Sequence, residues 1–374
     1  MYKPFHVFDE LAKKFDRFVL AYSGGKGSTA VAILLYQWAR IRKPNVEVVV
    51  LYVDTLSEIN VMEAWARWFL VEYVNRLGRY VRARLQEAVP PAVNTFYWRV
   101  FVRGYPAPSL TFPWCVENLI ARPAKKALEE HGNAVIITGL RHGGTTTKGT
   151  GLGSLLKSCL PGCCLGVYPL KSKMAKAAPI ENWTEEDVWA FLHMQRDFDV
   201  SPLFALHRVE NFRGSVRYGC WHCTVEDTQP ALYLDDKLLY IEAFRVLYMA
   251  ISRTPKYRVR RSRGRGKLGP LTANARSLMY HLTPIVERLS GHRFYGLDAA
   301  EVDGVSLRRL FYEYGDSELD EVVNRIDNTR RWVGAARLRR TPKIGAEIID
   351  KVSKLDSKGL VVEKARELLR LVKT

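Results

Sequence analysis

The stretch Ala21–Ala30 (AYSGGKGSTA) constrains the fold of this chain more than any other. The apolar run Arg17–Ala21 predicts a buried strand, and the apolar residues of Thr29–Arg40 predict a helix that packs on a sheet. A strand, a glycine-rich turn and a helix in this order place backbone N–H groups at a helix N-terminus, where anions bind. The stretch therefore predicts an α/β chain with an anion site at the turn; the alternative is a turn that binds nothing.

The side chains of this turn favour a phosphate as the anion. Lys26 supplies a positive charge, Ser23 and Ser28 supply hydroxyl groups, and Gly24 and Gly25 permit the backbone angles of a tight turn. The spacing differs from the Walker pattern, which needs four residues between its first glycine and Gly-Lys-Ser/Thr. We predict a nucleotide-phosphate site formed by Ser23, Gly24, Gly25, Lys26, Gly27, Ser28 and Thr29.

Two further predicted strands end in polar residues. The β-branched run Val46–Val53 ends at Asp54, where an acidic residue suits a ribose or adenine contact in open α/β sheets. Ala134–Gly139 reads as another buried strand, and Arg141 follows it in a position to bind a phosphate through its planar guanidinium. We predict that Asp54 and Arg141 bind the nucleotide; a plain helix-entry carboxylate is the alternative for Asp54.

Two motifs resemble a known family. Ser23–Ser28 (SGGKGS) is similar to the Ser-Gly-Gly-x-Asp-Ser loop of the adenine nucleotide alpha hydrolase superfamily, the PP-loop ATP pyrophosphatases. Pro179–Leu192 (PIENWTEEDVWAFL) resembles a motif of its phosphoadenosine phosphosulfate (PAPS) reductase family, and the likeness covers about the first three-fifths of the chain. The resemblance implies a divergent member with a Rossmann-like (HUP-type), mostly parallel sheet, helices on both faces, and ATP or another adenine nucleotide as ligand.

The motif Pro179–Leu192 also has a physical interpretation. Thr184 is placed to cap a helix, with Asp187 as the acidic residue three positions later. We expect Val188, Trp189 and Leu192 to face the core.

The chain departs from the family at two carboxylates. The loop aspartate is replaced by Gly27, and the acidic residue expected after Arg141 is absent, since Gly143 and Gly144 stand there. Because Mg²⁺ is usually held by carboxylates together with phosphates, both losses disfavour Mg²⁺ and nucleotide cleavage. PAPS reductases carry a catalytic cysteine in a C-terminal tail, and this chain has no cysteine beyond Cys223, so no catalytic residue is identified.

The six cysteines are too few for a disulfide scaffold at this length, and their clustering indicates a site. Tyr218–Cys223 (YGCWHC) contains a Cys-x-x-Cys pair, which suits a metal, an iron–sulfur cluster or a redox dithiol. The iron–sulfur branch of the family carries such a pair, and the resemblance implies a [4Fe-4S] cluster whose four ligands come from Cys115, the loop residues Cys159, Cys163 and Cys164, and Cys220 and Cys223. We take Cys115, Cys163, Cys220 and Cys223 as the candidate set, which the sequence does not fix uniquely. Zinc, a disulfide and free thiols are the alternatives, and His222 is expected to be a neighbour of the site rather than a ligand.

The charge of the chain favours polyanionic partners. The formal net charge is +18, which suits nucleic acid or nucleotides, although a basic proteome would give the same balance. Seven of the twelve residues of Lys256–Lys267 are basic, as in a phosphate-backbone contact or a solvated loop. We predict contacts with tRNA or DNA through Arg258, Arg260, Arg261, Arg263 and Arg265.

A chain of 374 residues is long enough for two domains. We expect a nucleotide-binding domain with a cysteine-rich insertion over 1–230 and a basic, mainly helical domain over 231–374. The predicted helices of the second part span 232–251, 273–290, 300–314, 317–338 and 343–373. Residues 88–113 contain five prolines and are expected to form an irregular loop.

The location is predicted from what the sequence does not contain. It has no stretch of 18 uncharged apolar residues and no signal-peptide pattern at its start, so we expect a cytoplasmic protein without a membrane span.

Two functions remain open on these grounds. The first is an enzyme of sulfur transfer that activates a nucleic acid or a related substrate with ATP and thiolates it, served by a sulfur-donor protein. The second is a non-catalytic protein that binds a nucleotide or nucleic acid on a degenerate PP-loop core.

Overall fold

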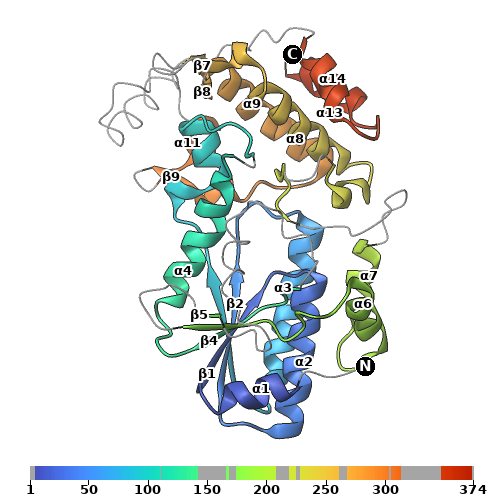
Figure 1. The fold of residues 1–374 in the computed structure, drawn as a ribbon. Coiled ribbons are helices and arrows are strands. Elements are labelled where there is room, and N and C mark those ends of the chain that lie inside the picture. Colours follow the sequence, from blue (N-terminus) through green and yellow to red (C-terminus); the bar gives the residue numbers. More distant parts are fainter. Residues whose placement is uncertain are drawn as a thin grey trace. The chain divides into compact units, whose positions relative to one another are not determined.

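The chain forms two compact units, each assembled from segments that lie far apart in the sequence (Figure 1). The computed structural model describes residues 5–109, 111–141, 166–167, 174–207, 219–224, 228–260, 268–302, 305–312 and 347–372. Unit 1 comprises Met1–Asp54, Val61–Val89 and Val116–Glu210, and unit 2 comprises Thr55–Asn60, Pro90–Cys115 and Asn211–Thr374. A domain boundary near residue 230 stays a prediction.

Unit 1 is built on a six-stranded sheet with the strand order β3-β2-β1-β4-β6-β5. Its strands are β1 (Arg17–Tyr22), β2 (Glu47–Val53), β3 (Arg82–Ala88), β4 (Val135–Ile137), β5 (Gly166–Val167) and β6 (Ala175–Ala177). All neighbours pair in parallel except β5, which runs antiparallel to β6. The Rossmann-like, mostly parallel sheet predicted from the sequence is therefore confirmed.

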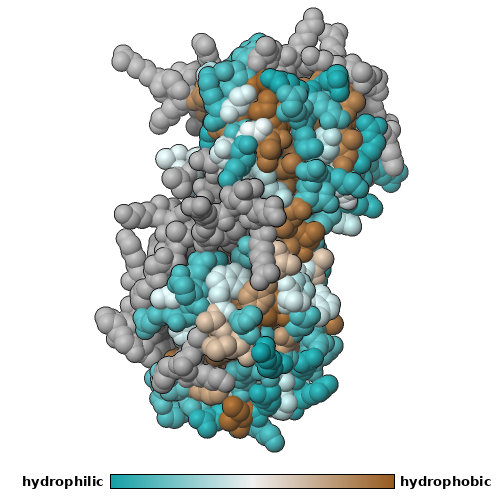
Figure 2. All heavy atoms as spheres, turned by 90° about the vertical axis from the view of Figure 1, so that its right-hand side faces the viewer, coloured by the Kyte–Doolittle hydropathy of each residue, from teal (hydrophilic) through white to brown (hydrophobic). Residues whose placement is uncertain are grey.

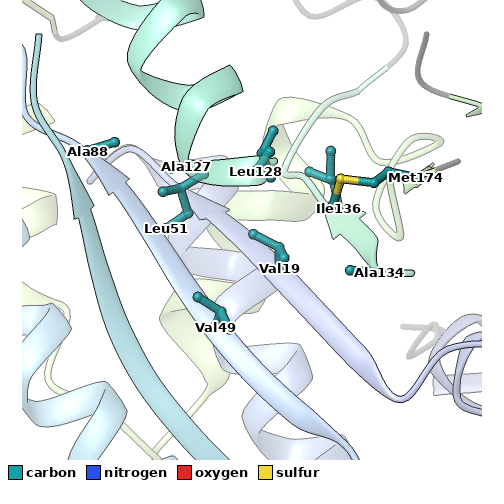
Figure 3. Packing of buried hydrophobic residues seen from close by; sticks show 9 residues of the cluster. All are labelled: Val19, Val49, Leu51, Ala88, Ala127, Leu128, Ala134, Ile136 and Met174. Atoms are coloured by element: carbon teal, nitrogen blue, oxygen red, sulfur yellow. The ribbon is translucent and has the colours of Figure 1, made fainter. Parts of the chain in front are cut away.

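Helices cover both faces of this sheet. Successive side chains of β1 point to opposite faces, so this strand contacts helices on both sides. On one face, Val19 packs with Ala127 and Leu128 of α4 (Arg122–Leu128), as Figure 3 shows. On the other, Phe18 stacks on Trp38 of α2 (Lys26–Arg42), and Tyr22 stacks on Phe69 of α3 (Asn60–Leu77). The remaining described helices of the unit are α1 (Phe5–Ala12), η3 (Val116–Ala121), α6 (Glu185–Met194) and α7 (Ser201–His207).

The start of α6 confirms the predicted capping residues. The Thr184 side chain accepts a hydrogen bond from the Asp187 backbone N–H, and the Asp187 carboxylate accepts one from the Thr184 backbone N–H. Val188 and Leu192 are buried as expected. The cap fixes the residue at which α6 begins, and this matters below because Glu185 is its first residue.

Unit 2 is mainly helical and is centred on α8 (Leu239–Ser252), whose residues are buried almost throughout. Packed against α8 are α9 (Ala273–Ser290), α13 (Glu347–Leu355) and α14 (Val362–Leu371). The other described elements are η1 (Ala92–Asn94), η2 (Trp98–Val102), η4 (Pro230–Tyr233), η5 (Pro255–Tyr257), β7 (Arg258–Arg260), β8 (Leu268–Leu271), α10 (Gly296–Ala299), β9 (Glu301–Val302), β10 (Val305–Ser306) and α11 (Leu307–Tyr312). Extra helices at the C-terminus are thus confirmed.

Several predicted element boundaries are wrong for identifiable reasons. The helix expected from residue 232 begins at Leu239, because the Asp235 side chain accepts a hydrogen bond from the Lys237 N–H and forms a turn before it. Residues 300–314 open with the hairpin β9–β10 before α11. Residues 347–372 form two helices rather than one, and Gly359 between them has φ +69°.

Other predictions on the second part have mixed outcomes. The helix predicted over 273–290 is confirmed as α9, whereas 88–113 is not an irregular loop throughout, since η1 and η2 lie in it. The helix predicted over 317–338 lies outside the described residues.

No described helix is long and apolar enough to cross a membrane. Figure 2 shows a face on which hydrophilic residues predominate and hydrophobic residues form separate patches.

Candidate functional site

The turn between β1 and α2 leaves the N-terminus of α2 open. Gly25 is the N-cap residue and makes no side-chain capping bond, and no acidic residue lies in the first turn of the helix. The Ser28 hydroxyl donates to the Gly25 carbonyl at 2.9 Å and lies 3.1 Å from the Ser23 hydroxyl, so both serines are fixed on the turn. An uncapped helix N-terminus with hydroxyl groups beside it attracts an anion.

Gly24 is held in place by α3. Its φ of +77° lies in the left-handed region that favours glycine, and its carbonyl accepts a hydrogen bond from the Trp65 indole N–H at 2.9 Å. A Cβ atom at this position would lie 3.0 Å from the Cβ of Ala66. The turn therefore has one well-defined shape, which both glycine and the packing against α3 determine.

Gly27 is required by a backbone contact with the chain that follows β4. A Cβ atom on Gly27 would lie 2.7 Å from the carbonyl oxygen of Gly139, closer than real Cβ atoms approach such an atom. The backbone as it stands has no room for an aspartate at position 27. This contact gives a physical reason for the departure from the loop pattern Ser-Gly-Gly-x-Asp-Ser.

Two positive side chains of unit 1 meet at one carboxylate. Lys26, at the start of α2, lies 3.0 Å from Glu185 Oε1, and Arg141, beyond β4, lies 3.7 Å from Glu185 Oε2. Only 11% of the Lys26 side chain and 12% of the Arg141 side chain are exposed, compared with 29% for Glu185. The structure thus brings the predicted phosphate residues Lys26 and Arg141 to a common point.

Trp189 belongs to this group, and the prediction that it faces the core is wrong. Its side chain is only half-buried. Its ring centroid lies 5.6 Å from the Lys26 ammonium, and its ring meets the His207 ring edge-on at 4.7 Å between centroids. Burial, with a smaller contribution from the positive charge of Lys26 and against an opposing effect of Glu185, lowers the pKa of His207 to about 3, so the imidazole is neutral. The described contacts of the Lys26 ammonium include the Glu185 carboxylate and the Trp189 ring, on which the neutral His207 imidazole packs.

Asp54 lies at the end of β2, at the same edge of the sheet as the turn after β1. Its carboxylate binds Arg67 of α3 at 2.6 Å, and this guanidinium also binds Glu63 and Glu87, each at 2.7 Å. The contact to Arg67 fits the alternative of a structural carboxylate. The nucleoside contact of Asp54 stays a prediction.

Three of the predicted cysteine ligands, Cys115, Cys220 and Cys223, lie in unit 2. Cys220 Sγ lies 3.2 Å from the Thr55 hydroxyl and 3.8 Å from Glu58 Oε1, and Thr55 donates to that carboxylate at 2.8 Å. Burial raises the pKa of the Cys220 thiol well above its ordinary value, and the negative charge of Glu58 raises it further, with smaller contributions from Cys115 and Cys223. Cys220 and Cys223 share one turn, in which the Cys223 backbone N–H donates to the Cys220 carbonyl at 3.0 Å.

These residues do not by themselves form a metal centre. Among the described residues, no group of three or more His, Cys, Asp or Glu side chains could hold a metal ion. Cys163, like Cys159 and Cys164, lies outside the described residues, so the predicted [4Fe-4S] cluster and its zinc alternative stay predictions. His222 is buried and stacks on Phe96 at 4.1 Å between ring centroids, a core position beside the Cys-x-x-Cys turn.

The predicted nucleic-acid residues belong to the hairpin of β7 and β8 and to the chain that joins them. Arg258 donates to the carbonyls of Ser252, Leu268 and Gly269, so it ties the hairpin together. Arg260 is the last residue of β7. Arg261, Arg263 and Arg265 lie outside the described residues, and nucleic-acid contact through this arm stays a prediction.

Sequence reasoning missed Glu185, Trp189 and His207. Glu185 and Trp189 lie within Pro179–Leu192, which was interpreted mainly as a capped structural helix, and their i, i+4 spacing places them on one face of α6. The shared helix face of Glu185 and Trp189 was the sequence signal that could have identified them as candidate site residues. His207 carries no motif and could be found only from the structure.

One similar solved structure is the crystal structure of phosphoadenylyl-sulfate (PAPS) reductase from Candida auris in a phosphate complex, with 18% sequence identity and a TM-score of 0.40. The match covers 60% of this chain and 91% of that one. A search of curated proteins found no match. The family model of the phosphoadenosine phosphosulfate reductase domain matches residues 17–226, more than half of the chain, and the chain therefore belongs to the PAPS reductase family.

Proposed function

We propose that the β1–α2 turn binds the phosphates of an adenine nucleotide and that the chain acts in sulfur transfer. The observation that carries the proposal is the convergence of Lys26 and Arg141 on one point beside the uncapped N-terminus of α2. Membership of a family of sulfur-metabolism enzymes supports the choice of ligand and of chemistry.

Each group of the turn has a separate part in this proposal. The Lys26 ammonium acts as a point charge, and the Arg141 guanidinium offers two parallel N–H donors to phosphate oxygens. Backbone N–H groups at the start of α2 and the Ser23 hydroxyl complete the anion site. These are bonds to phosphate, so the site should recognise the charged part of the nucleotide most strongly.

The sulfur chemistry belongs to the finer part of the proposal. ATP would activate a tRNA, a DNA or a related substrate for thiolation, with sulfur delivered by a donor protein in the cytoplasm. Cys115, Cys220 and Cys223 are the candidate thiols for handling sulfur, because all three belong to unit 2 and Cys220 and Cys223 share one turn.

A non-catalytic nucleotide-binding protein is the second candidate, and the packing of Gly27 favours it. With Gly139 against it, position 27 cannot carry a carboxylate to hold Mg²⁺ at the phosphates. Release of pyrophosphate or AMP from ATP, measured with and without RNA or DNA, distinguishes the two. Turnover supports sulfur-transfer chemistry, and ATP binding without turnover supports the second candidate.

Calorimetric titration tests the nucleotide site itself. The wild type should bind ATP or PAPS more tightly than AMP, and Lys26→Met should weaken ATP binding at least about tenfold, because a charge-assisted bond to phosphate is lost. Lys14→Met is the matched control, since Lys14 is exposed just after α1. If ATP, AMP and PAPS all give no heat with the folded wild type, the proposal is wrong.

A further inference from the structure

The Glu185 carboxylate stands between the two positive charges of the proposed phosphate site. Its Oε1 lies 3.0 Å from Lys26 Nζ, and its Oε2 lies 3.7 Å from Arg141 Nη2. The three residues come from different parts of unit 1: the first turn of α2, the chain after β4, and the first turn of α6. The pair of cations thus already holds an anion that belongs to the protein.

We propose that Glu185 is an internal competitor for phosphate, which a nucleotide must displace from between Lys26 and Arg141. The inference rests on the proposed function of this turn. Carboxylate and phosphate oxygens bind ammonium and guanidinium groups in the same way, so both anions suit the same place. They cannot share it, because two negative charges a few ångströms apart repel strongly where solvent is largely excluded.

The local structure allows Glu185 to leave without loss of α6. The helix is capped by Thr184 and Asp187, and Glu185 contributes to neither of their reciprocal hydrogen bonds. Its side chain is more exposed than either cation that it binds, so its carboxylate can turn toward solvent. Displacement therefore breaks the ion pairs with Lys26 and Arg141 and leaves the cap of α6 in place.

Lys26 keeps a support when Glu185 is displaced. Trp189 lies one helical turn beyond Glu185 on α6, and its ring centroid lies 5.6 Å from the Lys26 ammonium. The Trp189 ring is in turn packed edge-on against the His207 ring, at 4.7 Å between ring centroids. The cation is thus held near its place for an incoming phosphate by contacts that do not involve a carboxylate.

Competition predicts a selectivity among ligands. A polyphosphate carries several charges and can replace both ion pairs of Glu185, whereas a neutral nucleoside gains nothing from its departure. Removal of the carboxylate charge should therefore strengthen binding of pyrophosphate and ATP and leave adenosine unaffected.

The test is calorimetric titration of the full chain with inorganic pyrophosphate, ATP and adenosine. Glu185→Gln should bind pyrophosphate and ATP about tenfold more tightly than the wild type, the effect of one charge-assisted contact. Glu185→Ala is a second variant with the same expected direction. Glu186→Gln is the matched control, because Glu186 is the neighbouring, exposed residue of α6 and should leave all three affinities unchanged.

The outcomes separate this inference from the function on which it rests. If the wild type binds pyrophosphate and both Glu185 variants bind it equally or more weakly, Glu185 positions the cations rather than competing, and the inference alone is overturned. If neither the wild type nor any folded variant binds pyrophosphate or ATP, the proposed function and the inference both fail. Binding by the Glu185 variants with none by the wild type supports competition in its strongest form.

Discussion

Gly139 and Gly27 pack backbone against backbone, and neither position has space for a side chain. A Cβ atom on Gly139 would lie 2.4 Å from the carbonyl carbon of Gly27 and 2.6 Å from the backbone nitrogen of Ser28. These atoms belong to the first turn of α2, where the proposed phosphate site lies. The contact thus fixes the turn after β1 against the chain after β4.

Gly139→Ala should therefore damage both the stability and the proposed site. The added methyl group meets backbone atoms rather than the flexible end of a side chain, and such overpacking costs about 1–3 kcal/mol of unfolding free energy. Chemical denaturation measures this loss, and calorimetry should show weaker ATP binding by the same variant. Gly219→Ala is the control, since no atom of the described residues lies within 4 Å of a Cβ atom there. Equal stability of the two variants would contradict the contact.

Cys220 should become more reactive when the charge of Glu58 is removed. The carboxylate helps to raise the pKa of the Cys220 thiol, although burial is the larger cause. Glu58→Gln should therefore move the pH profile of Cys220 alkylation by iodoacetamide to lower pH, as followed for the individual peptide by mass spectrometry. Glu301→Gln, at an exposed position of unit 2, should leave the profile in place. An unshifted profile in Glu58→Gln would remove the electrostatic link.

The buried ion pair of α8 should be far more sensitive to loss of one charge than an exposed pair. Arg245 lies 2.6 Å from Glu242, their side chains are 0% and 1% exposed, and Arg245 also donates to the Cys223 carbonyl at 2.8 Å. Glu242→Gln leaves a guanidinium buried without its counter-charge, and we expect a loss of about 3–5 kcal/mol in unfolding free energy.

The control for the buried pair is the exposed pair of α14. Glu363 and Arg366 form an exposed ion pair on this helix. Glu363→Gln should change the denaturation midpoint little, because exposed pairs contribute little. A similar, small effect of both substitutions would show that Glu242 is not needed to compensate Arg245.

The stability of unit 2 should fall as the pH is lowered, in part because of His292. Burial lowers its pKa to about 4, against a smaller opposing effect of Glu287, while the unfolded chain has the ordinary value of 6.5. The unfolded state therefore binds the proton between these values. The contribution of neutral His292 to the unfolding free energy is complete above pH 6.5. It falls by up to about 3 kcal/mol as the pH is lowered toward 4.

His292→Asn should reduce this slope, because the replacement cannot titrate. Unfolding free energies measured between pH 4 and pH 7 give the slope for each variant. His193→Asn is the control, since His193 is exposed at the end of α6. The assignment fails if His292→Asn keeps the slope of the wild type.

Local sequence patterns predicted the first half of unit 1 well. The apolar strand, the glycine turn and the long apolar helix are adjacent in the chain, so β1, the turn and α2 follow from neighbouring residues. The capping residues Thr184 and Asp187 also act within one helical turn. The helix predicted over 300–314 was wrong because the hairpin β9–β10 depends on pairing between two very short strands, which helical periodicity does not reveal.

The contacts within the candidate site could not be predicted from the sequence. The pattern SGGKGS and the family-like motif around Trp183 correctly predicted a Rossmann-like chain, because each is a short-range signal, whereas anion binding at the turn stays a prediction. Only the tertiary structure decided that Glu185 lies between Lys26 and Arg141, and that Gly27 meets Gly139. The order of the parallel strands brings these distant residues to one edge of the sheet, and no local propensity encodes that proximity.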